Sequence, residues 1–105
     1  MPWIYLVLAG LFEIGWPVGL KLAQQINTRI TGIIIAIFCM ALSGLLLWLA
    51  QKQIPIGTSY AVWTGIGAAG TFLVGVVFFE DSTNLMRFLG VLLIIGGVAV
   101  LKLSH

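Results

Sequence analysis

Four long apolar stretches, separated by short polar segments, make up most of this 105-residue sequence. A helix that spans a bilayer requires about 20 consecutive apolar residues. We therefore predict transmembrane helices at about 3–20, 30–50, 56–79 and 86–102. The fourth contains the shortest apolar run, residues 88–101, and it spans only if Arg87 and Lys102 extend toward the two interfaces. The predicted fold is an all-α membrane protein with one four-helix transmembrane domain over residues 1–105.

The composition supports the bilayer as the solvent of this chain. Hydrophobic residues make up 61% of the sequence and charged residues 8%, whereas about a quarter of an ordinary soluble domain is charged. The basic residues are scattered, so we expect no nucleic-acid partner. Cys39 is the single cysteine, which excludes a disulfide within the chain, and we expect it to pack in the core. Since no metal-ligand set, nucleophile–base pair or phosphate loop appears, we expect neither enzymatic activity nor a cofactor.

The basic residues give almost no instruction about orientation in the membrane. Four helices place both ends of the chain on one face, with Lys52 and Lys102, while Lys21, Arg29 and Arg87 lie on the other. Two against three is nearly balanced under the positive-inside rule. Either a weaker bias fixes one orientation, or the chain inserts both ways and forms an antiparallel, dual-topology homodimer. The small size favours the dimer, because four thin helices can hardly enclose a solute path alone.

Glu13 is the single acidic residue within the predicted helices. A carboxylate near the bilayer centre costs about 2.5 to 3.5 kcal/mol on insertion scales, so such residues usually face an interior cavity and have a function there. Gly10, Trp16 and Pro17 are three or four residues away and share its helix face. Gly10 is expected to leave room beside the carboxylate, and Trp16 to offer an aromatic wall with an N–H donor.

Two neighbours of Glu13 each allow two interpretations. Pro17 lacks an amide hydrogen and clashes with the carbonyl of residue 13, which predicts a bend and a free acceptor at Glu13. The alternative is a kink that is tolerated without function. Ser43, near the middle of the second helix, either orients Glu13 or bonds to the backbone of its own helix.

The third helix carries an aromatic face. Tyr60, Trp63 and Gly67 are spaced so that they share one side of a helix. Aromatic faces with a carboxylate form a natural receptor for an organic cation. Protons and such a cation can both neutralise Glu13, but not at the same time, which is the coupling that an exchanger needs. The glycine-rich segment that includes Gly65 and Gly67 predicts a hinge.

Small residues at regular spacing predict close helix contacts. Gly67, Thr71 and Gly75 are four residues apart, which lets two helices approach closely. Gly90 and Gly97 are seven apart on the fourth helix and therefore share a face. We expect these two glycines to pack between subunits.

Three segments resemble the small multidrug resistance transporters. They are Gly10-Leu11-Phe12-Glu13, residues 55–67 (PIGTSYAVWTGIG) and residues 90–97 (GVLLIIGG). Trp16 together with Ser43, and Gly10 before Glu13, look like the guanidinium-exporter subtype of that family. The resemblance implies an antiparallel homodimer in a bacterial inner membrane that exports guanidinium by alternating access in exchange for protons.

The same resemblance implies roles for individual residues. Glu13 is expected to bind protons and substrate, which compete for the two carboxylates of the dimer. Orientation of the carboxylate is implied for Trp16, Ser43 and Trp63, gating or contact with Glu13 for Tyr60, and dimer packing for Gly90 and Gly97.

Three functions stay open at this point. The first is export of guanidinium or a small substituted guanidine of the alkylguanidine, biguanide or guanylurea type. Substituted cargo is suggested by Pro17 and Ser59, because guanidinium exporters commonly have a small residue and alanine there. The second is a broad exporter of quaternary ammonium and other drug cations. The third is a non-transporting membrane subunit of a heterodimer.

Overall fold

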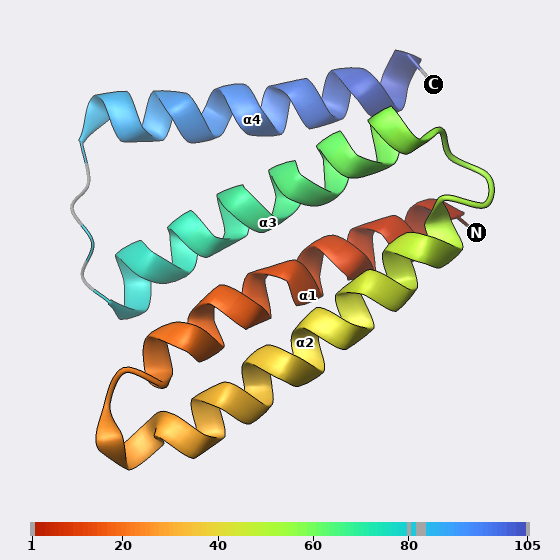
Figure 1. Ribbon diagram of the computed structural model, residues 1–105. Helices are drawn as coiled ribbons and strands as arrows, with labels where there is room; N and C mark the ends of the chain where they lie inside the picture. The colour runs from red at the N-terminus through yellow and green to blue at the C-terminus, as the bar shows by residue number, and fades with distance from the viewer. Residues whose placement is uncertain (1, 80, 82–83, 105) are drawn as a thin grey trace.

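A computed structural model describes residues 2–79, 81 and 84–104 as an all-helical chain (Figure 1). Each of the four α-helices in the described part is long and apolar enough to cross a membrane. They are α1 (Pro2–Leu22), α2 (Arg29–Ala50), α3 (Ile56–Phe78) and α4 (Leu85–Ser104), with a short 3₁₀ helix, η1 (Ile26–Thr28), before α2. Their ends differ from the predicted ranges by no more than two residues. The continuous apolar runs account for these elements.

The helices lie side by side in the order α4, α3, α1 and α2 (Figure 1). The principal extents of the backbone are 44, 34 and 16 Å. Since a helix with its side chains is about 10–12 Å wide, this is close to a single layer. The beginning of α1, the end of α4 and the α2–α3 connection lie at one end of the layer. The connection between α1 and α2 lies at the other end.

The best-packed region lies at the end of the layer that holds the α2–α3 connection. Leu6, Ala50, Ile54 and Val62 are all buried there and form one cluster. Ile54 belongs to the connection itself and is 2% exposed. Ser59 is also buried, and its hydroxyl donates to the carbonyl of Ile54 at 3.3 Å. This region therefore fixes the angle at which α3 leaves α2.

The contact between α1 and α2 depends on small residues that the sequence analysis did not single out. A Cβ atom added to Gly32 would overlap the carbonyl of Gly19 and the backbone of Ala23. A Cβ atom added to Gly19 would lie 2.7 Å from the backbone nitrogen of Ala36. The two backbones thus touch directly, as in other membrane helix pairs with small residues at the interface. Cys39 fills the space left by Gly15 in the same contact.

The helix α4 packs on α3 and is also fastened near its two ends. None of its residues is buried. The ammonium group of Lys102 lies 5.1 Å from the ring centre of Trp3, and the guanidinium of Arg87 lies 5.2 Å from that of Phe72. Both distances are within the range of cation–π attraction. The two basic residues that were expected to reach the interfaces therefore also fasten α4 to its own subunit.

Two alanine substitutions in α2 test the close contact with α1. Gly32→Ala is expected to lower the free energy of unfolding by about 1–3 kcal/mol, because backbone atoms of α1 must move to admit the methyl group. Gly44→Ala meets nothing within 4 Å and is expected to be neutral or to stabilise by up to about 1 kcal/mol through helix propensity. Unfolding in mixed micelles, followed by circular dichroism, measures both. Equal effects would contradict a backbone contact at Gly32.

Candidate functional site

The carboxylate of Glu13 lies on α1 beside the indole of Trp16. The Nε1–H of Trp16 donates to Oε1 of Glu13 at 2.7 Å. The two residues are three apart, so helix geometry alone brings them to one face. Glu13 is half-buried, and its Oε2 accepts no hydrogen bond from the described residues. One carboxylate oxygen is thus fixed, and the other is available to a ligand.

The backbone of α3 forms the wall opposite Glu13. A Cβ atom added to Gly67 would overlap Cγ of Glu13. The glycine is therefore the residue that leaves room for the carboxylate side chain. The side chain of Ile66 lies beside Gly10, with its Cβ 2.7 Å from the position of an added Cβ on this glycine. Gly10 thus lets α3 approach α1 one turn away from the carboxylate, and its role in leaving room for Glu13 stays a prediction.

Ser43 joins three helices at the turn of α1 that precedes Glu13. Its hydroxyl donates to the carbonyl of Ala9 on α1 at 2.7 Å and accepts the Nε1–H of Trp63 on α3 at 2.7 Å. Ser43 is 1% exposed. In an α-helix the carbonyl of residue 9 also accepts the amide of residue 13. Ser43 and Trp63 therefore hold the backbone turn that carries Glu13.

This network excludes a bond from the Ser43 hydroxyl to the backbone of its own helix, α2. The hydroxyl does not bond to the Glu13 carboxylate either, so orientation of Glu13 by Ser43, through the turn of α1, stays a prediction. The partner on α1 was not predictable, because it depends on how far α2 is shifted along α1. Trp63 likewise acts through Ser43 and does not bond to the carboxylate in this structure.

Tyr60 extends the aromatic face of α3 outward from Trp63. The two ring centres are 5.4 Å apart and the ring planes are inclined by 57°, a normal geometry for an aromatic pair. Tyr60 is 57% exposed. It lines an open apolar groove of about 680 Å³ between α3 and α4, together with Gly97. Tyr60 is therefore exposed at the α3–α4 groove and contacts Trp63 of the Ser43 network.

Pro17 and four glycines were predicted to bend helices or to pack against other helices. Both α1 and α3 are helical without a break at Pro17, Gly65 and Gly67, so the bend and the hinge stay predictions. Gly65 admits the side chain of Val98 from α4. Gly90 and Gly97 have open space beside them within the subunit. Packing between subunits at these two glycines stays a prediction.

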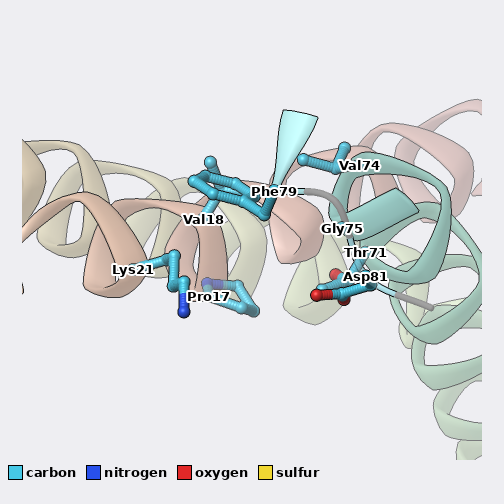
Figure 2. A pocket seen from close by; sticks show the side chains of 8 residues that line it. All are labelled: Pro17, Val18, Lys21, Thr71, Val74, Gly75, Phe79 and Asp81. Atoms are coloured by element: carbon cyan, nitrogen blue, oxygen red, sulfur yellow. The ribbon is translucent and has the colours of Figure 1, made fainter. Parts of the chain in front are cut away.

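A cavity of about 200 Å³ continues the α1–α3 contact beyond Glu13. Figure 2 shows Pro17 and Lys21 from α1 on one side of it and Thr71 and Asp81 on the other. Its remaining lining residues are Val18, Val74, Gly75 and Phe79. This cavity was not predicted from the sequence. The sequence feature that could have indicated it is a four-residue spacing on both helices. On α1 the spaced residues are Glu13, Pro17 and Lys21, and on α3 they are Gly67, Thr71 and Gly75.

Chemically, the arrangement offers one acid in an apolar setting. A carboxylate with a free oxygen can accept a proton or pair with an organic cation. Among the described residues, no three His, Cys, Asp or Glu side chains gather where they could hold a metal ion.

Comparison with known proteins gives a match over most of the chain. The family described as Small Multidrug Resistance protein matches residues 1–94. The guanidinium exporter of Yersinia pseudotuberculosis is 48% identical over 104 residues, which cover 99% of each chain. The guanidinium exporters of Escherichia coli K12 and Proteus vulgaris are each 47% identical over 104 residues, covering 99% of this chain and 98% and 99% of theirs.

Removal of the Ser43 hydroxyl tests the network that holds α1. Ser43→Ala leaves the indole N–H of Trp63 without its acceptor in a buried place, which is expected to lower the free energy of unfolding by about 1–3 kcal/mol. The Trp63 indole resonance should shift in the ¹⁵N–¹H NMR spectrum, while that of Trp16 stays in place. Ser104→Ala removes an exposed hydroxyl bond and should change stability by no more than about 0.5 kcal/mol. A shift of the Trp16 resonance alone would refute this assignment.

Proposed function

Because this chain belongs to the small multidrug resistance family, we propose that it exports guanidinium or small substituted guanidinium cations across a bacterial inner membrane in exchange for protons. The observation that carries the proposal is the half-buried Glu13, which is fixed by Trp16 through one oxygen and keeps the other free. Identities of 47–48% to guanidinium exporters over nearly the whole chain support the class of substrate.

The chemistry of guanidinium fits this site. The cation is planar and presents paired N–H donors, which match the two oxygens of a carboxylate. It also stacks on aromatic rings, as arginine does. Glu13 supplies the charge, and Trp16 supplies an indole beside it. Trp63 and Tyr60 supply further aromatic surface on α3.

Proton coupling follows from the presence of one acid per chain in the spanning helices. Glu13 is neutralised either by a proton or by the cation. A carboxylate that holds neither is costly in an apolar region, so the transporter changes sides only when one of the two is bound. Alternating access with mutually exclusive occupancy then links export of the cation to entry of protons.

An antiparallel homodimer is part of the proposal. The subunit is close to a single layer of helices and cannot enclose a path by itself. None of the residues of α4 is buried, and its Gly90 and Gly97 have open space beside them, which suits a close contact with a second copy. The nearly balanced basic residues on the two faces suit insertion in both orientations.

Glu13→Gln tests the coupling. The amide keeps the size of the side chain but carries no negative charge, so guanidinium exchange driven by a pH gradient should fall to background in proteoliposomes. Cross-linking in micelles should still detect the dimer, because Glu13 lies at the α1–α3 contact. Retained pH-driven transport in this variant would refute the role of the carboxylate.

A panel of cations tests the substrate class. Substrate-induced currents in proteoliposomes of the purified chain should be observed with guanidinium and guanylurea and should be small with tetrapropylammonium, which offers no N–H donors. Strong currents with tetrapropylammonium and none with guanidinium would indicate a quaternary ammonium exporter instead. Currents only after addition of a second gene product would indicate one half of a heterodimer.

A further inference from the structure

The cavity beyond Glu13 lies along the same contact between α1 and α3 as the carboxylate. Glu13, Pro17 and Lys21 follow one another at four-residue spacing on α1, so they share one face over two helical turns, about 12 Å. On α3 the matching row begins at Gly67, which faces Glu13, and continues to Thr71 and Gly75. The cavity is therefore the next space along one seam, between Glu13 and the end of the helices.

Asp81 is held at the mouth of this cavity by the end of α3. Its backbone N–H donates to the carbonyl of Gly75 at 3.0 Å. Its carboxylate occupies the position that a side chain on Gly75 would take. The negative charge is thus fixed against the helix backbone and directed into the space that Pro17 and Lys21 line from the other side (Figure 2).

The two opposite charges in the cavity form no direct ion pair. No nitrogen–oxygen pair between Lys21 and Asp81 lies within the 4.0 Å of an ion pair. Both side chains are exposed. A solute that enters the cavity therefore meets a carboxylate that no described cation pairs with.

The size of the cavity suits a small solute. Its volume is about 200 Å³, whereas pockets for drug-sized ligands are about 300–1,000 Å³. A single water molecule needs only about 10–15 Å³ by the same kind of measure. A guanidinium-sized cation with some of its water fits, next to the apolar side chains of Val74 and Phe79.

We propose that this cavity is a capture site, in which the carboxylate of Asp81 binds a small organic cation at the membrane surface before it moves along the α1–α3 seam to Glu13. This inference rests on the proposed function. Lys21, on the opposite wall, repels the same cation and keeps the capture weak. Weak sites in series favour passage, because each must release the ion that it binds.

Variants that remove the charge of Asp81 or of Lys21 test the capture site. The measured quantity is the KM of guanidinium exchange in proteoliposomes. The salt concentration is about 0.01 M, where charges act over about 30 Å. Asp81→Asn should raise KM about threefold, the effect of a partly exposed charge pair, with little change in the maximal rate. Asp81→Glu should keep KM close to that of the wild type. Raising the salt should reduce the difference between wild type and Asp81→Asn.

The matched control compares two cations on the same membrane face. Lys21→Gln and Arg29→Gln remove the same charge, but Arg29 does not line the cavity and instead bonds to the carbonyl of Ala23. Lys21→Gln should lower KM about twofold or more, and Arg29→Gln should change it clearly less. Equal effects of the two would mean that only the overall surface charge acts, and would overturn the proposal.

Direct binding separates this inference from the proposed function. In Glu13→Gln, ¹³C-guanidinium should still show line broadening from weak binding, and the double variant with Asp81→Asn should lose it. The capture site would be overturned if guanidinium showed no line broadening with Glu13→Gln. It would also be overturned if Asp81→Asn left KM unchanged, whether or not the maximal rate of this variant fell. A wild-type protein that binds guanidinium weakly but does not exchange it would contradict the proposed function alone.

Discussion

An ionisable group within an apolar span governs how the other helices are placed. A carboxylate that faced lipid would be costly, and α1, which carries Glu13, accordingly lies between α2 and α3 in the layer (Figure 1). The hydrogen bond from Trp16 satisfies one oxygen, and Gly67 brings the backbone of α3 against the side chain. The helix α3 thus covers the side of α1 that carries Glu13, and α2 packs on another side of α1 through Gly19 and Gly32.

The two ends of the layer differ in packing. At the end near the α2–α3 connection, Leu6, Ile54 and Val62 are buried in one cluster. At the other end the α1–α3 seam opens into a cavity lined by Lys21 and Asp81. The small residues of α3 allow this difference, because glycine at 67 and 75 lets acidic side chains lie directly on the helix backbone.

The position of α4 is held by different interactions from those that hold the other three helices. It buries none of its residues within the subunit and is fastened by cationic side chains over Trp3 and Phe72 near its two ends. In lipid, apolar surface alone gives no drive to associate, so close packing and polar contacts must supply it. The open space at Gly90 and Gly97 provides a surface for such packing.

The sequence by itself determined the elements and the local chemistry. Runs of apolar residues fixed four spans to within two residues, and the contact of Trp16 with Glu13 follows from their spacing on one helix. Only the tertiary structure decided that Gly67 makes room for the carboxylate, that Ser43 bonds to Ala9, and that Asp81 and Lys21 line opposite sides of one cavity. The physical reason is that a helix which is apolar on all sides has no polar face to indicate its rotation. Rotation and axial shift are then set by how small residues such as Gly19 and Gly32 fit against the neighbouring backbone.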